Sequence, residues 1–166
     1  MNCTMIEKWN GKVNEDDYVI HAGDFALTGK KKKKGFIDAL NGKIILIKGN
    51  HDSGSYSKLK RLGFYEVYNK FLILNKYIII SHKPLDIKDI KQYERVAYKK
   101  DTNFKYQIKV NLHGHIHNKN YENDNKDISY KNICVEKLNY EPKTLKEIGL
   151  KNQKSYNFIG LSKMSL

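Results

Sequence analysis

The stretch Ile44-Ile45-Leu46-Ile47-Lys48-Gly49-Asn50-His51-Asp52 indicates both the fold class and the position of the chemistry. Its four consecutive apolar residues predict a strand that is buried on both faces, as in α/β sheets. The apolar run stops before Gly49, and three polar side chains that are competent to bind metal follow at once. Ligands of open α/β sheets bind at the carboxyl ends of the strands. We therefore expect Asn50, His51 and Asp52 to lie at a functional edge of a sheet.

Three other predicted strands end in a similar way. They are 18–20, 77–80 and 108–112, and the motifs near their ends are Gly23-Asp24, Ser81-His82 and Gly114-His115-Ile116-His117. If all four ends align, one aspartate, one asparagine and four histidines converge on one edge. The neighbouring glycines allow sharp turns and close approach of the backbone. His115 and His117 share a face if their segment is extended, and straddle two neighbouring metals if it turns.

The side chains at these strand ends form a chemically specific set. Imidazole nitrogens combined with carboxylate and amide oxygens suit borderline divalent metals such as Mn, Fe, Zn, Co or Ni. Calcium takes only oxygen ligands and fits this set poorly. Each motif alone also occurs in ordinary turns and loops. Their occurrence together, in this order, favours a metal site over coincidence.

Length and charge limit the other possibilities. A chain of 166 residues with 40% hydrophobic residues predicts one globular domain spanning 1–166. Lys and Arg number 31 against 18 Asp and Glu, which gives a net charge of +13. This charge suits polyanionic partners such as nucleic acid, nucleotides or phosphorylated small molecules, although lysines on solvated faces are the simpler explanation. The run Lys30–Lys34 has the same two interpretations, a nucleic-acid patch or a solvated, partly frayed segment before an apolar helix.

Cysteine usage and hydropathy predict the compartment. Cys3 and Cys134 form neither a disulfide framework nor a zinc-knuckle pattern, which indicates a reducing environment. No apolar run reaches the roughly 18 to 20 residues of a membrane span, and no signal-peptide pattern opens the sequence. We therefore expect a soluble, cytoplasmic protein without a membrane partner. Nothing in the sequence indicates the oligomeric state.

Apolar periodicity and turn residues predict the remaining elements. The helices are expected over 1–11, 30–40, 56–62 and 144–150, and the basic first half of the second one is either helical or frayed loop. Further strands are expected over 43–48, 64–68, 71–74 and 132–135. Residues 86–101 are charged and weakly periodic, so part helix and part loop is expected there. Residues 118–131 are polar and predict a loop.

The four strand-end motifs resemble those of the calcineurin-like metallophosphoesterase superfamily, in the order found in that family. The similarity covers most of residues 5–150 and is greatest to small single-domain bacterial and phage members. Further matching positions are Met5–Asn10, His21–Phe25, Leu40–Asp52, Val135-Glu136, Tyr140, Pro142 and Leu145. The resemblance implies an α/β sandwich of two sheets flanked by helices, with a dinuclear metal site at the strand ends.

The resemblance also implies an activity and a set of metal ligands. The reaction would be hydrolysis of a phosphodiester or phosphomonoester by a hydroxide that bridges two divalent metals, with manganese preferred over iron, zinc, cobalt or nickel. Asp24 would bridge the two metals. Asn50, His82 and His115 would complete one metal site. His117 would ligate the other metal.

Two further residues are implied to take part in catalysis. His51 would not bind metal; it would lie near the leaving oxygen and act as a general acid or stabilise developing charge. Asp52 would orient His51. The substrate itself is not encoded in a readable motif, and a phosphorylated small molecule, a nucleotide and nucleic acid all suit the chemistry.

One motif of the family, Asp-x-His on an N-terminal strand, does not occur in this sequence. It supplies two ligands of the site to which His117 belongs, so that site would keep only Asp24 and His117. Neither His21 nor His113 is expected to be a substitute ligand. Either Met1 is an internal start of a longer protein, or the protein is genuinely shortened and lacks the first strand. In the second case it would be a degenerate relative that binds one metal, or nucleic acid through its basic surface.

Overall fold

The computed structural model describes residues 3–102, 105–123, 125–150 and 159–160. The helices are α1 (Cys3–Asn10), α2 (Lys30–Asp38), α3 (Tyr56–Leu62) and α4 (Ile87–Lys100). The strands are β1 (Tyr18–His21), β2 (Lys43–Ile47), β3 (Glu66–Tyr68), β4 (Phe71–Asn75), β5 (Ile78–Ser81), β6 (Val110–His113), β7 (Ser129–Asn132) and β8 (Ile159–Gly160). Among these residues, no helix has both the length and the apolar character that crossing a membrane requires.

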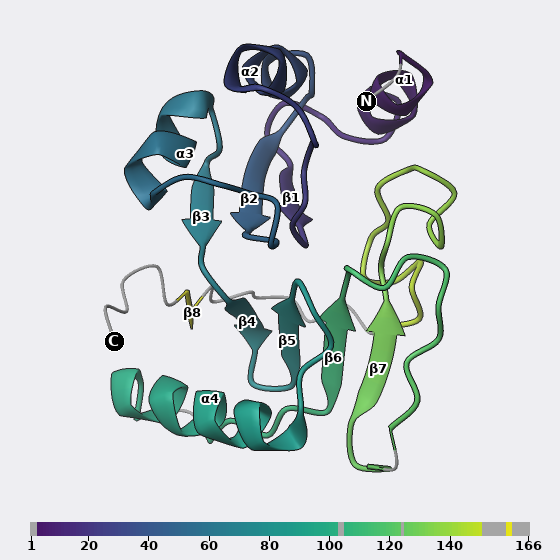
Figure 1. The fold of residues 1–166 in the computed structure, drawn as a ribbon. Helices are drawn as coiled ribbons and strands as arrows, with labels where there is room; N and C mark the ends of the chain where they lie inside the picture. Colours follow the sequence, from purple (N-terminus) through teal and green to yellow (C-terminus); the bar gives the residue numbers. More distant parts are fainter. Residues whose placement is uncertain (1–2, 103–104, 124, 151–158, 161–166) are drawn as a thin grey trace.

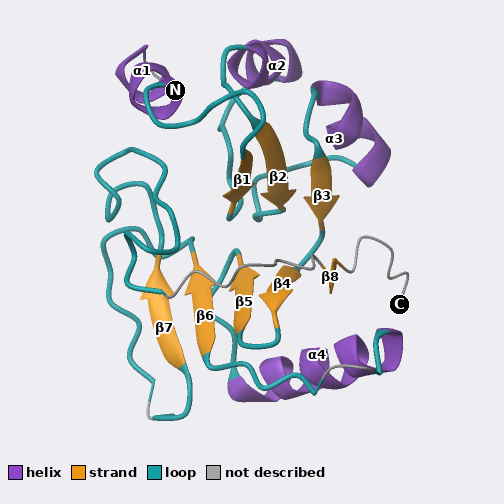
Figure 2. Ribbon diagram, turned by 180° about the vertical axis from the view of Figure 1, so that it is seen from behind, coloured by secondary structure: helices purple, strands orange, loops and turns teal. Residues whose placement is uncertain are grey.

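The strands form two separate sheets. The first sheet has the order β1-β2-β3 with parallel pairing throughout. The second has the order β7-β6-β5-β4-β8, in which β5, β6 and β7 are parallel and β4 is antiparallel to both of its neighbours. The carboxyl ends of β1 and β2 point toward those of β5, β6 and β7 (Figure 2). Loops that are distant in the sequence therefore meet between the two sheets.

The side chains of β2 point alternately to the two faces of the first sheet, toward the helices on one face and toward the second sheet on the other. Ile44 and Leu46 belong to the apolar cluster that includes side chains of α2 and α3. Ile45 and Ile47 point the other way and pack against side chains of the second sheet. Successive side chains of a strand face opposite sides of its sheet, so one short apolar run contributes to two cores.

Side chains on the other face of the second sheet pack against helix α4, which forms the last layer. Phe71, Ile73 and Ile79 pack against Ile90 and Ala97 of α4. The resulting order is helices, first sheet, second sheet and helix, and Figure 1 shows α4 on the side of the second sheet that faces away from α2 and α3. The expected two-sheet α/β sandwich flanked by helices is thus confirmed.

Two segments that the sequence pattern left partly undecided are helical throughout. Helix α2 begins at Lys30, so the lysine run is helical and not a frayed segment. Helix α4 is continuous from Ile87 to Lys100, where part helix and part loop were expected. Fully buried Ile90 and Ala97, seven positions apart, stand on the same helix face and anchor α4 to the sheet.

The segment after β6 differs from the expectation. Strand β7 begins inside the polar stretch predicted as loop, and of the strand predicted over 132–135 only Asn132, the last residue of β7, is in a strand. The Asn132 side chain accepts a hydrogen bond from the backbone N–H of Cys134 at 2.9 Å. This local turn ends the strand where the apolar pattern would have continued it.

The predicted helix over 144–150 forms only a single turn. The Ile148 N–H donates to Thr144 O, and the Leu150 N–H donates back to Leu145 O. Gly149 lies between them with φ of +77°. A glycine in this left-handed conformation closes a helical turn, so the segment stops before a second turn can form.

Candidate metal centre

Four of the predicted ligands come from four different strands and meet in one place. Asp24 follows β1, Asn50 follows β2, His82 follows β5, and His115 follows β6. Each of Asp24, His82 and His115 has a donor atom within 4.8 Å of the other two. The site therefore joins loops of both sheets.

A backbone carbonyl fixes the state of the His82 ring. His82 Nδ1 lies 2.8 Å from Ala22 O. A carbonyl oxygen only accepts, so Nδ1 carries the proton. In the neutral ring, Nε2 is then left with a free lone pair. This is the tautomer that a metal-binding histidine uses, with its other nitrogen held by a hydrogen bond.

His82 Nε2 is surrounded by other lone pairs. Asn50 Oδ1 lies at 2.9 Å, His115 Nδ1 at 3.0 Å and Asp24 Oδ2 at 3.3 Å. Burial is the largest cause that lowers the pKa of His115 below its usual value. A divalent cation coordinates such a convergent set of nitrogens and oxygens. The residues present fit a borderline metal bound by Asp24, Asn50, His82 and His115.

Glycines allow the ligand loops to touch. A Cβ on Gly49 would lie 2.1 Å from Asp24 Oδ1 and 2.5 Å from Asp24 N. Gly23 has φ of +93°, and a Cβ there would lie 2.5 Å from His82 Nδ1. The loops approach so closely that only glycine fits at the first position of the Gly-Asp and Gly-Asn-His-Asp motifs.

Three residues at the site adopt an unusual backbone conformation. Asp24, His115 and His117 have φ of +53°, +68° and +51°. Non-glycine residues in this region cost on the order of 1 kcal/mol each and concentrate at functional sites. This strained conformation thus occurs at two of the candidate ligands, Asp24 and His115, and at His117.

Asp52 holds the ligand loops together. It is 3% exposed, and its Oδ2 accepts hydrogen bonds from the backbone N–H groups of Asp24 at 2.6 Å and Gly49 at 3.0 Å. Its Oδ1 accepts from Phe25 N at 3.3 Å and lies 3.3 Å from Lys33 Nζ. None of these donors is the His51 ring. Asp52 therefore holds the two ligand loops in place, and the expected contact between Asp52 and the His51 imidazole is not present.

Lys33 is a site-supporting residue that the sequence interpretation missed. It lies within the lysine run, yet it is only 6% exposed and pairs with Asp52. A signal was present, because Lys33 stands four positions before the buried Ile37 and therefore shares its helix face. The run divides into one buried lysine and exposed neighbours at 30–32 and 34.

His51 lies at the edge of this arrangement. Its backbone N–H donates to Asp24 Oδ1 at 2.8 Å, which ties the residue to the ligand loop. Its side chain is exposed and forms no hydrogen bond with another residue that the structure describes. The imidazole is therefore free to meet a substrate beside the ligands.

His117 lies outside the group formed by Asp24, His82 and His115. Its side chain is 76% exposed, and Nδ1 lies 2.7 Å from Glu136 Oε1. This hydrogen bond lowers the pKa of Glu136 below its usual range. Glu136 belongs to the stretch that resembles the family's closing strand, but no sequence pattern assigns it a role.

The two remaining histidines, half-buried His21 and buried His113, lie near the site without joining it. Nδ1 of His21 is buried without a hydrogen-bond partner among the described residues, and its ring lies edge-on to Phe25. Burial lowers the pKa of His21 to about 4. Burial also lowers the pKa of His113, whose Nδ1 lies 3.2 Å from Gly114 O.

Known proteins share this sequence and this fold. The profile of the calcineurin-like phosphoesterase superfamily domain matches residues 2–133. An uncharacterized protein of Methanocaldococcus jannaschii is 32% identical over 151 residues, which are 87% of this chain and 71% of the relative. The crystal structure of a protein of unknown function from Aquifex aeolicus matches with a TM-score of 0.62 and 25% identity, over 87% of this chain and 81% of that one. Because the family profile covers most of the sequence, this chain belongs to the calcineurin-like phosphoesterase superfamily.

Proposed function

We propose that this protein hydrolyses phosphoric esters, either phosphodiesters or phosphomonoesters, with two divalent metal ions, manganese first among them. The observation that carries the proposal is the convergence of Asp24, Asn50, His82 and His115 around unshared lone pairs. When bound, the metals polarise the phosphate and supply a water molecule activated for attack on phosphorus.

The chain's own residues hold and orient the reacting groups. Asp24, Asn50, His82 and His115 would bind one ion, and Asp24 with His117 would contribute to the second. The hydrogen bond from His117 Nδ1 to Glu136 supports this role, because it leaves Nε2 of His117 as the free nitrogen.

His51 would complete the reaction as a general acid. Its ring is exposed beside the ligands while its backbone is fixed to Asp24 Oδ1. A protonated imidazole there donates its proton to the leaving oxygen and stabilises the negative charge that develops on it. Asp52 would act through the backbone by holding Asp24 and Gly49 in place.

The proposal is tested by assaying an aryl phosphomonoester and an aryl phosphodiester with Mn²⁺ and then with excess chelator. Activity should appear with metal and disappear with chelator. Asp24→Ala should lose bound metal, whereas Asp38→Ala, an exposed carboxylate of α2, should keep it. His51→Ala should retain metal and lower kcat by roughly 10² to 10⁴. Chelator-insensitive activity contradicts the proposal, and metal loss in His51→Ala contradicts the role of that residue.

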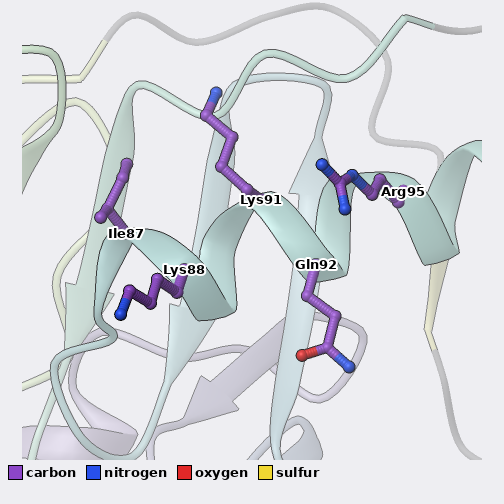
Figure 3. Close-up of a pocket in the computed structure, with 5 residues that line it drawn as sticks. All are labelled: Ile87, Lys88, Lys91, Gln92 and Arg95. Carbon is purple, nitrogen blue, oxygen red and sulfur yellow. The ribbon is translucent and has the colours of Figure 1, made fainter.

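A second candidate function is nucleic-acid binding, which the exposed face of α4 favours. A groove of about 570 Å³ runs along this helix, and its lining residues all belong to α4 (Figure 3). Lys88, Lys91 and Arg95 supply three cations, one of which pairs with Glu94 at 3.1 Å. A row of cations along a helix suits the phosphate backbone of nucleic acid.

This second function is tested by salt-dependent binding to single- and double-stranded oligonucleotides. Replacing Lys88, Lys91 and Arg95 together by Gln should weaken binding and reduce its salt dependence. The matched control replaces three exposed lysines elsewhere, Lys105, Lys119 and Lys126, by Gln. Equal weakening in both variants would show that net charge alone attracts the nucleic acid.

A further inference from the structure

A second cavity lies beside the candidate metal centre. It has a volume of about 260 Å³ and is formed by α2, α3 and the loop after Asp52. Four cationic side chains line it, Lys30, Lys33, Lys58 and Arg61. The hydroxyl residues Thr28 and Ser53 also line it, and no acidic residue does.

The charges around this cavity are only partly compensated. Lys33 pairs with Asp52 at 3.3 Å. Arg61 donates from Nε to the carbonyl of Ser57 at 3.2 Å, which leaves its charge unpaired. Lys30 and Lys58 form no ion pair with any residue that the structure describes. Like charges around one cavity repel each other, and an anion bound among them offsets this repulsion because it attracts each of them.

The wall of the cavity is connected to the ligand loops. Ser53 directly follows Asp52 and is two residues from His51, which limits the separation of their Cα atoms to about 7.6 Å. Lys33, in the cavity wall, contacts Asp52, which in turn accepts the Asp24 backbone N–H at 2.6 Å. By contrast, the groove on α4 is built by one helix on the far side of the second sheet.

We propose that this cavity binds a phosphate-type oxyanion, either as a free ion or as a second phosphate of a substrate held at the neighbouring centre. Lysine and arginine donate charge-assisted hydrogen bonds to phosphate oxygens, and the two hydroxyls add further donors. The second source rests on the proposed phosphoesterase function. In that case the substrates of the proposed phosphoesterase would carry more than one phosphate.

Binding is measured first, without metal, so that its result does not depend on hydrolysis. Inorganic phosphate and pyrophosphate are titrated calorimetrically into the full chain in excess chelator at about 0.15 M salt. The variant Lys30→Gln/Lys58→Gln is compared with Lys31→Gln/Lys32→Gln, which removes the same charge from exposed positions of α2 outside the cavity. Thermal unfolding verifies that both variants are folded.

The cavity variant should bind pyrophosphate at least about tenfold more weakly, because it loses two charged donors. The control should bind within about threefold of the unmodified protein, because its charges act only through screened solvent. Lys30→Arg/Lys58→Arg should restore most of the affinity. Absence of saturable binding in the unmodified protein, or equal weakening in cavity and control variants, would overturn the proposal.

A kinetic comparison then separates the two sources. If the cavity takes a substrate phosphate, an ester with a second phosphate should have a lower KM than its one-phosphate counterpart, and Lys30→Gln/Lys58→Gln should remove that difference. If it takes the free ion, the KM ratio should be the same in both proteins while pyrophosphate binding still differs. A protein that binds pyrophosphate but hydrolyses neither ester would retain the cavity assignment and contradict only the phosphoesterase function.

Discussion

The carbonyl of Ala22 determines what His82 can do. By accepting the Nδ1 proton at 2.8 Å, it leaves Nε2 as the nitrogen that faces Asn50, Asp24 and His115. Ala22 itself is part of the turn that carries Asp24. One short segment after β1 therefore carries one candidate ligand and also orients another from the other sheet.

Gly49 should be nearly irreplaceable. In Gly49→Ala, the new Cβ would meet Asp24 Oδ1 at 2.1 Å and Asp24 N at 2.5 Å, so the aspartate must move. We expect the free energy of unfolding to fall by about 1 to 3 kcal/mol, as for other forced contacts, and metal affinity to fall at least about tenfold. Denaturant unfolding and metal titration measure the two effects.

Gly35 is the matched control for this prediction. It lies inside α2, and a Cβ there would have no heavy atom within 4 Å. Alanine is a better helix former than glycine, so Gly35→Ala should raise the free energy of unfolding by roughly 0.5 to 1 kcal/mol and leave metal affinity unchanged. If both substitutions lowered metal affinity alike, the close approach at Gly49 would not be the cause.

His21 should make the metal-free protein sensitive to acid. Its pKa is about 4 in the folded state against 6.5 ordinarily, so between these pH values only the unfolded chain takes up the proton. This contribution is constant above pH 6.5, and it reduces stability as the pH falls from 6.5 to 4, by at most about 3 kcal/mol because the ring is partly exposed. His21→Phe should make stability fall less steeply over this range, as measured by denaturant unfolding in chelator. Equal slopes in both proteins would contradict the assignment.

The candidate ligands could be predicted from the sequence, whereas the residues that support them could not. Each of the four candidates, Asp24, Asn50, His82 and His115, lies within three residues of the end of a strand, and strand ends are marked locally by apolar runs and glycines. The partners of Lys33 are set by how α2 packs on the first sheet, which no local pattern encodes. Because Lys33 stands in a run of five lysines, the sequence does not distinguish this buried residue from its exposed neighbours.

At the scale of elements, α2 supports the centre through a single buried charge. Lys33→Met keeps most of the side-chain volume but leaves Asp52 without its cationic partner. Breaking a buried pair typically costs about 3 to 5 kcal/mol, and three backbone N–H donors to Asp52 remain, so we expect the lower end of this range. Lys32→Met, on the exposed side of α2, should change stability by no more than about 0.5 kcal/mol. Urea unfolding of both variants measures the contrast, and similar values for the two would show that the pair contributes little.

Element boundaries were predicted best where a local signal ends the element. Helix α3 has its predicted bounds because Gly63 closes it with φ of +119°. Gly149 has the same kind of conformation, but it follows so soon after Thr144 that only one turn forms. The continuity of α4 depends instead on burial of Ile90 and Ala97 against the second sheet, which its charged composition concealed.

At the scale of the whole molecule, the candidate centre connects the two sheets. Asp24 and Asn50 follow strands of the first sheet, and His82 and His115 follow strands of the second. The sheets also meet in the apolar cluster that includes Ile45, Ile47 and their neighbours. An ion bound by all four side chains would therefore link the two halves of the sandwich.

This arrangement predicts that metal binding stabilises the entire fold. Mn²⁺ at about 100 times its Kd should add roughly 2.7 kcal/mol, and for a chain of this length that corresponds to a rise in Tm of about 5 to 10 °C. Excess chelator should reverse the rise. Asp24→Asn should abolish most of it, because the amide removes the negative charge from the ligand set. Asp38→Asn should keep it, since that carboxylate is exposed and pairs with Lys34 on the same helix.

The shape of the transition distinguishes a link between the sheets from local ordering. If the ion joins both sheets, unfolding monitored by far-UV circular dichroism and by fluorescence of Trp9, which packs beside the first sheet, should shift together. A metal that ordered only the ligand loops would change local hydrogen exchange near residues 22–24 and 49–52 and leave the global Tm where it was. That outcome, or an undiminished shift in Asp24→Asn, would contradict the centre described here.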